Sequence, residues 1–233
     1  MLPIRALLID FDGTACLQDV SEMLLDAFGE PDWERFDDAV DRGEMGLREA
    51  AEHQAAMLRG TRERMLAYAL EHAELAPTFA PFAEWADANE LPITLASDGF
   101  AIYIRPLLEW SGLGRLPVIT NELDVQTDGR VRLRHPNGHP VCIGCGTCKM
   151  LAAQRLRAEH GPIAFVGEGQ SDRYGAIYSD AVFAKDALVQ ICEQDGVPFL
   201  PWDTFDDVRG SLEQMRALPG AVDPERCPGW RTP

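Results

Sequence analysis

The stretch Ala6-Leu7-Leu8-Ile9-Asp10-Phe11-Asp12-Gly13-Thr14 decides the fold of this chain. Its first four residues are all apolar, which is typical of a short strand buried on both faces of a parallel sheet. Asp10 and Asp12 follow at once, and because they are two positions apart they face the same side of an extended chain. Ligands of open parallel sheets bind at the carboxyl ends of the strands. The stretch therefore predicts a site built on two carboxylates.

Two later segments repeat this arrangement of an apolar run followed by a polar turn. Ser97-Asp98-Gly99 follows the run at 93–96, and the string GEGQSD at 167–172 follows the run at 163–166. Carboxylates gathered at one sheet edge repel one another unless a cation lies between them. The sequence therefore predicts a Mg²⁺ site suited to phosphate chemistry.

Composition limits the possible partners. A chain of 233 residues fits one large domain, or one core with a smaller insert. A formal net charge of −17 argues against nucleic acid and anionic membranes as partners. No apolar segment is long enough to span a bilayer, and the amino terminus runs into a strand without a basic leader. We therefore expect a cytoplasmic protein.

The alternation of strand-like and helical patterns predicts an α/β fold with a parallel sheet. The exception is the stretch from about Asp19 to Leu75, where only helical patterns occur. Four short helices are expected there: one closed by Gly29, one started by Pro31, one ending at Gly60, and one capped by Thr61. We expect an α/β core at 1–15 and 76–216, a helical cap at 16–75, and an irregular tail at 217–233.

Outside this helical stretch, the patterns predict further elements of the core. The predicted helices cover 79–90, 102–110 (where Pro106 limits the start) and 149–159, and the predicted strands cover 91–97, 118–125, 131–134, 163–166, 181–184 and 197–200. The turn Thr127-Asp128-Gly129-Arg130 favours a hairpin between the strands at 118–125 and 131–134.

The first acidic pair suits phosphoryl transfer through the protein. One carboxylate can attack phosphorus and form an acyl phosphate, while the other gives a proton to the leaving alcohol and later takes one from water. A calcium loop is a poorer fit, because the glycine comes too early and no acid stands at the closing position. A solvated Asp-Gly turn is the remaining alternative.

The later segments offer groups that could hold a phosphoryl group. Ser97 would present a hydroxyl at a strand tip, with the amides of Asp98 and Gly99 beside it. Lys149 opens a predicted helix and could neutralise the attacking carboxylate. Taken alone, the serine string could be an ordinary turn and the lysine a surface residue.

The last acidic string places Glu168 and Asp172 four positions apart after a buried strand. One acid can bind the cation, while the other orients Lys149 or a metal-bound water. A phosphate loop of the Walker type is excluded, because its Gly-Lys-Ser/Thr ending is missing.

The order of these motifs resembles that of the haloacid dehalogenase (HAD) superfamily of phosphatases. That order is Asp-x-Asp-Gly-Thr, then Ser, then Lys, then Gly-acid-x-x-x-Asp, and it spans about residues 4–200. The strings FVGEGQSDR at 165–173, VFAKD at 182–186 and GEMGLREA at 43–50 are similar to the phosphoserine phosphatase branch. CGTCK at 145–149 resembles the approach to the motif lysine in the phosphatase of methionine salvage, and the phosphocholine and phosphoethanolamine branch also carries cysteines there.

The resemblance implies a Rossmann-like HAD core with an inserted helical cap, and it implies roles for single residues. Asp10 would be the nucleophile, Asp12 the acid/base and Lys149 the third catalytic residue. Thr14, Ser97, Asp98 and Gly99 would lie at the phosphate, and Mg²⁺ would be bound by Asp10, the carbonyl of Asp12 and Glu168, with Asp172 in support. Glu168 departs from the family, which usually has Asp there, and its extra methylene bears on Mg²⁺ because this ion tolerates misplaced ligands poorly. Arg48 is a weaker candidate for contact with the substrate.

Three of the six cysteines form the pattern C-x2-C-x2-C at Cys142, Cys145 and Cys148, with His135 and His139 just upstream. Three thiolates and one imidazole would suit a structural Zn²⁺, although plain reduced thiols are the simpler interpretation. An iron–sulfur site is disfavoured, because the fourth cysteine and proline of the ferredoxin run do not follow. A disulfide between Cys145 and Cys148 is disfavoured by the expected compartment.

The function predicted from these motifs is a Mg²⁺-dependent phosphomonoesterase that acts on a small phosphorylated metabolite through an aspartyl phosphate. Phosphotransfer or mutase action is the enzymatic alternative, and a catalytically weak member that binds a phosphorylated ligand is the other. The sequence does not choose among phosphoserine, the methionine-salvage phosphate, phosphocholine-like head groups and pyridoxal phosphate.

Overall fold

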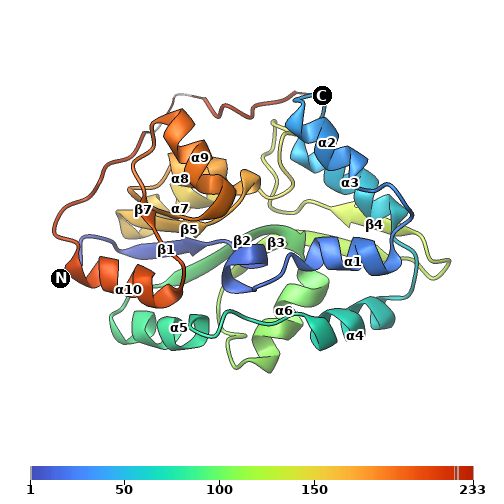
Figure 1. Ribbon diagram of the computed structural model, residues 1–233, viewed down its shortest axis with the longest axis horizontal. Coiled ribbons are helices and arrows are strands. Elements are labelled where there is room, and N and C mark those ends of the chain that lie inside the picture. The colour runs from blue at the N-terminus through green and yellow to red at the C-terminus, as the bar shows by residue number, and fades with distance from the viewer. Residues whose placement is uncertain (1, 223, 225, 233) are drawn as a thin grey trace.

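A seven-stranded sheet runs through the centre of the computed structural model, which describes the whole chain except residues 1, 223, 225 and 233 (Figure 1). The strand order is β4-β3-β2-β1-β5-β6-β7, and every neighbouring pair is parallel except β3 and β4. The strands are β1 Ala6–Ile9, β2 Ile93–Phe100, β3 Val118–Val125, β4 Val131–Arg134, β5 Ile163–Gly167, β6 Ala181–Ala184 and β7 Leu200–Pro201. The expected α/β fold and the β3–β4 hairpin are confirmed.

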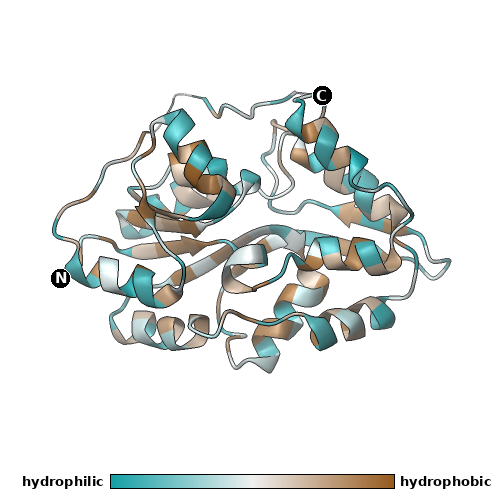
Figure 2. Cartoon of the chain, in the orientation of Figure 1, coloured by the Kyte–Doolittle hydropathy of each residue, from teal (hydrophilic) through white to brown (hydrophobic). Residues whose placement is uncertain are grey.

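The central strand β1 explains why the sheet carries helices on both faces. All four of its residues are buried, and successive side chains of a strand point to opposite faces. Leu7 and Ile9 join one apolar cluster, while Ala6 and Leu8 join the other. The first cluster takes in α5 Phe79–Ala88, α6 Ala101–Trp110 and α10 Phe205–Gln214, and the second takes in α7 Lys149–His160, α8 Arg173–Ile177 and α9 Asp186–Asp195. Figure 2 shows the same contrast, with apolar strands between helices whose outer sides are polar.

Four α-helices lie between about Asp19 and Leu75, as expected. They are α1 Val20–Phe28, α2 Arg35–Asp41, α3 Leu47–Met57 and α4 Arg62–His72. Thr61 caps α4 as predicted, because its side chain accepts a hydrogen bond from the amide of Arg64 at 3.4 Å. Helices α2 and α3 stand above the hairpin, whereas α1 and α4 lie along the face that carries α6 (Figure 1).

The start of one predicted helix was wrong, and so was the limit expected at Pro106. Helix α2 begins at Arg35 rather than near Pro31, because Asp32 takes a left-handed conformation with φ of 66° that interrupts the helix. Helix α6 begins at Ala101, directly after β2, and continues through Pro106. No described helix combines the length and apolar character needed to cross a membrane.

The C-terminal tail contains no helix or strand among its described residues, yet it is bonded to the core. The amide of Gly220 donates to the carbonyl of Asp180 at 3.2 Å, and the hydroxyl of Tyr178 donates to the carbonyl of Pro224 at 3.1 Å. The described part of the tail then crosses toward α2 (Figure 1).

Candidate active site

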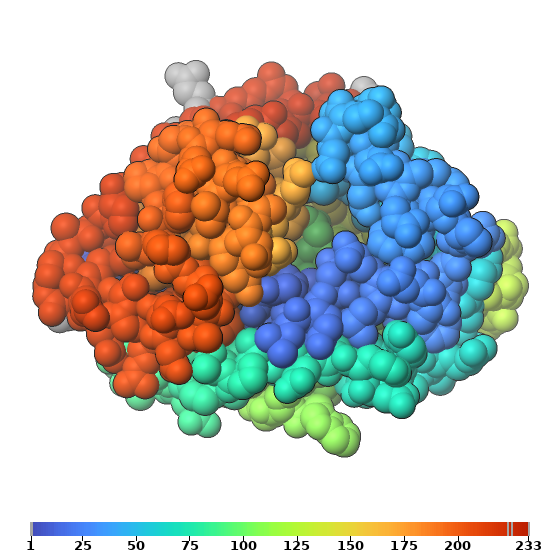
Figure 3. Space-filling model, in the orientation of Figure 1, coloured from blue at the N-terminus to red at the C-terminus, as the bar shows by residue number. Residues whose placement is uncertain are grey.

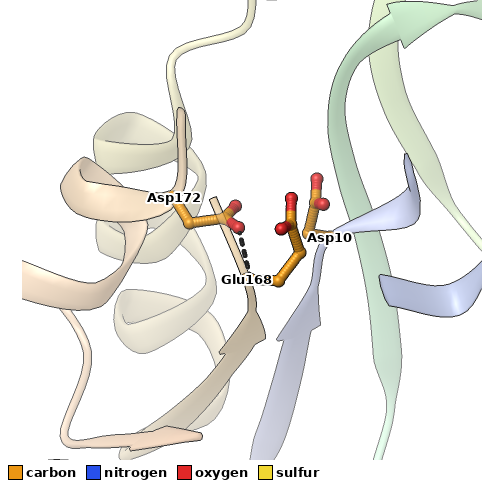
Figure 4. Close-up of side chains that lie close together, drawn as sticks. All are labelled: Asp10, Glu168 and Asp172. Carbon is orange, nitrogen blue, oxygen red and sulfur yellow. Dashed lines mark hydrogen bonds between the residues drawn. The ribbon is translucent and has the colours of Figure 1, made fainter. Parts of the chain in front are cut away.

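Three carboxylates converge at the carboxyl ends of β1 and β5. Asp10 follows β1, and its amide donates to the carbonyl of Val166 in β5 at 2.9 Å, which extends the pairing of the two strands. Figure 4 shows the side chains of Asp10, Glu168 and Asp172 turned toward one another. One oxygen from each lies within 4.8 Å of the other two. The first and last acidic motifs of the sequence therefore meet in space.

Lys149 connects these carboxylates from the first residue of α7. Its Nζ lies 2.7 Å from Oδ1 of Asp10, 2.6 Å from Oδ1 of Asp172 and 2.9 Å from Oγ of Ser171. The side chain is fully buried, and burial alone lowers the pKa of a lysine. The charges of Asp10 and Asp172 outweigh burial and raise the pKa of Lys149 above its ordinary value, so this lysine is charged.

Asp172 positions its neighbours. Its Oδ2 accepts hydrogen bonds from the amides of Glu168 at 2.8 Å and Gly169 at 3.0 Å, while its Oδ1 faces Lys149. Both oxygens of this buried carboxylate are thus engaged by the protein. Asp172 fixes the backbone that presents Glu168 and, at the same time, the ammonium group that faces Asp10.

The longer acid at position 168 fits its surroundings. Gly13 has a φ of 68°, and a Cβ built on it would lie 3.0 Å from Cδ of Glu168, so the side chain fills space that only glycine leaves open. Burial, and then the charge of Asp172, raises the pKa of Glu168 to about 7. Three carboxylates facing one ammonium leave an excess of two negative charges, which a divalent cation would balance. The residues present therefore fit a Mg²⁺ ion.

Asp12 is held by a separate set of donors. Its Oδ2 accepts from Oγ of Ser97 at 3.0 Å and from the hydroxyl of Tyr103 at 2.9 Å, and its Oδ1 accepts from the amide of Val20 at 3.0 Å. Burial, followed by the charge of Asp19, raises the pKa of Asp12 to about 7. A carboxyl group with this pKa can both give and take a proton near neutral pH.

In the serine motif, Gly99 is bonded to Ser97, and the side chain of Asp98 is bonded to a different loop. The amide of Gly99 donates to Oγ of Ser97 at 2.8 Å, and a Cβ on Gly99 would collide with the hydroxyl of Tyr103 and with Asp12. The side chain of Asp98 points toward the loop before α7, where it accepts from the amide of Thr147 at 2.6 Å. Asp98 therefore positions the loop that presents Lys149.

A cavity of about 320 Å³ opens above these residues, between the sheet edge and the helices inserted after β1. The side chain of Gln170 donates to Oδ1 of Asp41 across its mouth at 2.7 Å. Figure 3 shows the surface hollowed where the α2 segment faces the segment after β5. The inserted helices and the linker before α1 contribute apolar, acidic and neutral polar residues to the lining. These are Leu25, Val40, Leu47, Ala50 and Ala51, the acids Asp19, Glu22, Asp37 and Asp41, and Ser21 and Gln54.

Several predicted residues lie outside this cavity. Arg48 pairs with Glu52 at 3.1 Å and lines a separate depression beside β4. His135 contacts Asn121 at 2.8 Å and Glu52 at 3.0 Å, and Nδ1 of His139 accepts from the amide of Cys142 at 2.9 Å. Thr14 is buried below the sheet edge, and its hydroxyl has no hydrogen-bond partner among the described residues.

The predicted zinc set is not assembled. His135 is bonded to Asn121 and Glu52, away from the cysteines. His139 lies beside the three thiols, but these groups do not converge on one point. Among the described residues, the acidic group of Asp10, Glu168 and Asp172 is the one set of three or more potential ligands whose atoms all lie within 4.8 Å of one another.

Sequence reasoning missed two residues of the site. Tyr103 donates to Asp12 from the first turn of α6, and Ser171 contacts Lys149 from the loop after β5. Ser171 stands inside the last acidic string and could have been recognised there. Tyr103 gave a weaker signal, a polar aromatic residue a few positions after the serine motif.

The family model of haloacid dehalogenase-like hydrolases matches residues 7–176, well over half of the chain. The chain belongs to this family. Among curated proteins, the HAD chain is 29% identical over 213 residues to the bifunctional enzyme MtnB/MtnX of Bacillus licheniformis, covering 89% of this chain and 49% of that protein. It thus spans about half the length of that relative.

A further curated protein and a solved structure are also similar to this chain. The HAD chain is 24% identical over 211 residues to the 2-hydroxy-3-keto-5-methylthiopentenyl-1-phosphate phosphatase of Bacillus cereus, covering 88% of this chain and 94% of that protein. A solved phosphoserine phosphatase, captured as an analogue of its phospho-aspartyl intermediate, superposes with a TM-score of 0.69 at 15% identity, covering 91% of this chain and 99% of that one. The expected resemblance to HAD-type phosphatases is confirmed, and the solved structure supports the fold.

Proposed function

We propose that this HAD chain is a Mg²⁺-dependent phosphomonoesterase that hydrolyses a small phosphorylated metabolite through an acyl phosphate formed on the Asp10 carboxylate. The observation that carries the proposal is the placement of Asp10, whose Oδ1 lies 2.7 Å from the buried ammonium of Lys149. Glu168 and Asp172 face the same point, at the floor of the cavity. A carboxylate held between an ammonium group and a cation site can approach an anionic phosphate.

Asp10 and Glu168, with the carbonyl of Asp12, would hold Mg²⁺, and Asp172 would keep Glu168 in place. The ion would supply positive charge for the phosphoryl oxygens and so stabilise the transition state. Lys149 adds a fixed positive charge beside Asp10 and partly neutralises the repulsion between this carboxylate and the phosphate.

Asp12 carries out the proton transfers. A carboxylate oxygen of Asp10 bonds to phosphorus as the bond to the alcohol oxygen breaks, and protonated Asp12 donates a proton to that oxygen. Asp12 then accepts a proton from water, and the water oxygen releases phosphate from Asp10. The donors Ser97 and Tyr103 hold Asp12 in place between the two steps, with a pKa of about 7 suited to both.

The lining of the cavity favours a substrate whose remaining part is apolar. The described residues that line it include no lysine, arginine or histidine, so a second anionic group on the substrate would have no cationic partner there. Apolar side chains from the inserted helices would accommodate a thioether or hydrocarbon tail. We therefore propose a substrate like that named for the Bacillus cereus relative, rather than phosphoserine.

One observation favours a second candidate class. Four acids of the inserted segment line the same cavity, and burial, with the charges of its acidic neighbours, raises the pKa of Glu22 to about 7. A cationic head group such as that of phosphocholine would relieve this repulsion. Charge on the substrate distinguishes the two classes.

A panel of phosphate esters tests both the activity and the substrate class. We expect Mg²⁺-dependent release of free phosphate without an added acceptor, fastest with apolar esters and slow with phosphoserine. Asp10→Asn should abolish release, whereas Asp32→Asn, an exposed acid outside the cavity, should leave it unchanged. Equal release by the wild type and Asp10→Asn would refute the proposal, and dependence on an acceptor alcohol would favour phosphotransfer.

A further inference from the structure

Four cysteines from two distant segments of the chain surround one small cavity. Cys142, Cys145 and Cys148 come from the loop before α7, and Cys227 comes from the C-terminal tail. All four are free thiols, and Cys142, Cys148 and Cys227 are each less than a tenth exposed. The rest of the lining is largely aromatic and apolar: His139, Lys149, Met150, Tyr174 and Trp230.

Hydrogen bonds fix the tail against the cysteine loop. The amide of Ile143 donates to the carbonyl of Arg231 at 3.0 Å, and the amide of Arg231 donates to Sγ of Cys142 at 3.3 Å. Gly144 packs so closely on Gly229 that a Cβ at position 144 would collide with the carbonyl of Gly229. These contacts between the backbones of the tail and the loop hold Cys227 beside the other three cysteines.

Backbone amides point at several of the sulfurs. Sγ of Cys142 accepts from the amide of Gly144 at 3.3 Å, in addition to that of Arg231. The amides of Met150 and Leu151 face the thiol of Cys148, and the amide of Gly229 faces that of Cys227. Amide donors around sulfur stabilise the negative charge of thiolates and tune the potential of iron–sulfur centres.

The spacing of the sulfurs argues against a single ion. Zn²⁺ holds sulfur at about 2.3 Å, which brings four sulfurs to about 3.8 Å from one another. Among the described cysteines, no three have their sulfurs within 4.8 Å of one another. The four thiols instead line one shared small cavity. A cluster of several irons holds its cysteines farther apart than one ion does.

The sequence pattern also fits once the tail is included. A ferredoxin-type cluster takes three cysteines spaced C-x2-C-x2-C and a fourth, remote cysteine that is followed by proline. Cys227 is followed by Pro228. A fourth cysteine and a proline do not follow Cys148 directly, but the fold brings Cys227 and Pro228 to this loop from the C-terminal tail.

We propose that Cys142, Cys145, Cys148 and Cys227 bind a [4Fe–4S] cluster. Binding displaces a proton from each thiol, because the thiolate is the ligand. The cluster joins the tail to the loop that ends at Lys149. From the tail, Arg231 donates to the carbonyls of Gly43 at 2.9 Å and Met45 at 3.1 Å, before α3. The cluster thus fastens the lysine loop and the inserted helices to one another.

Anaerobic reconstitution of the full chain with ferrous iron and sulfide tests this site without reference to phosphatase activity. We expect about four irons and four sulfides per chain, with broad visible absorption that bleaches on reduction. Cys227→Ser and Cys142→Ser should each lose at least half of the bound iron and sulfide. Cys192→Ser, a buried thiol of α9 outside the cavity, should retain the wild-type content. Circular dichroism checks that each variant folds.

Three results would overturn the proposal. One is a chain that binds one zinc and no sulfide. Another is a folded chain that binds neither metal nor sulfide after reconstitution. The third is cluster content that Cys227→Ser leaves unchanged. None of these results depends on the proposed hydrolysis of phosphate esters, so the two proposals can fail separately.

Discussion

Replacing Tyr103 by phenylalanine should move the pH dependence of catalysis in a predictable direction. The hydroxyl of Tyr103 donates to Oδ2 of Asp12 at 2.9 Å, and this bond lowers the pKa of Asp12 from the value that burial would otherwise impose. Phenylalanine keeps the ring but removes the donor. Loss of the bond destabilises the charged carboxylate, so the pKa of Asp12 must rise.

The size of the shift follows from the strength of the bond. A hydrogen bond to a charged group contributes about 1.5–3 kcal/mol, and one pKa unit corresponds to about 1.4 kcal/mol. Asp12 keeps its bonds from Ser97 and Val20, so the lower end applies. The pKa of Asp12 should rise from about 7 to about 8.

The assay is the pH profile of kcat/KM for an alkyl phosphate that the enzyme hydrolyses. Asp12 must be protonated to donate to the leaving alcohol, so activity falls as pH rises through its pKa. In Tyr103→Phe this alkaline limb should move up by about one unit. With p-nitrophenyl phosphate, whose leaving group needs no proton, the limb should be weak in both proteins.

Tyr68→Phe, a change in α4 away from Asp12, is the matched control and should leave the profile unchanged. An alkaline limb that stays in place in Tyr103→Phe, or that moves to lower pH, would refute the role assigned to Asp12.

Three further predictions concern the metal site and its supports. Without Mg²⁺, the free energy of unfolding should fall as pH rises from about 4 to about 7. The reason is that the pKa values of Asp12 and Glu168 are raised to about 7 in the folded state, so the folded state binds more protons than the unfolded state over this pH range. Denaturant titrations that show stability rising with pH over this range would contradict the prediction. Glu168→Asp should weaken Mg²⁺ binding about tenfold, because the shorter side chain withdraws from the space beside Gly13. Calorimetric titration with Mg²⁺ measures this affinity. An unchanged or tighter affinity would mean that the longer side chain of Glu168 does not favour Mg²⁺ binding. Gly99→Ala should reduce kcat at least a hundredfold, because the added methyl group displaces Tyr103 or Asp12. Gly210→Ala, where no atom lies within 4 Å of the added carbon, is the control and should leave kcat unchanged. Equal kcat in the two variants would argue against close packing at Gly99.

The sequence was sufficient to predict the sheet edge. Each acidic or serine motif follows an apolar run, and parallel pairing brings the carboxyl ends of β1, β2 and β5 together whatever the details of packing. Asp10 and Glu168 could therefore be placed near one another from pattern alone. Thr61 was recognisable as a cap because that signal is local.

Interactions between distant segments could not be predicted in this way. Arg48 was expected at the substrate, but the direction of its side chain depends on how α3 packs, and it pairs with Glu52. Cys227 lies in a tail without secondary structure, so no periodicity linked it to the loop of Cys142. Helix α10 was not predicted, although Thr204 and Asp207 form a capping box at its start.

The most direct test of the proposed chemistry is to identify the residue that carries phosphate during turnover. Enzyme quenched in acid under saturating substrate and Mg²⁺ should yield one peptide, containing Asp10, that is heavier by a single phosphoryl group and is lost on treatment with hydroxylamine. With p-nitrophenyl phosphate, whose leaving group needs no proton, Asp12→Asn should accumulate more of this species, because the attacking water then lacks its base. Asp10→Asn should form none. Phosphate found on another residue, or turnover with no phosphorylated enzyme in either wild type or Asp12→Asn, would contradict the account.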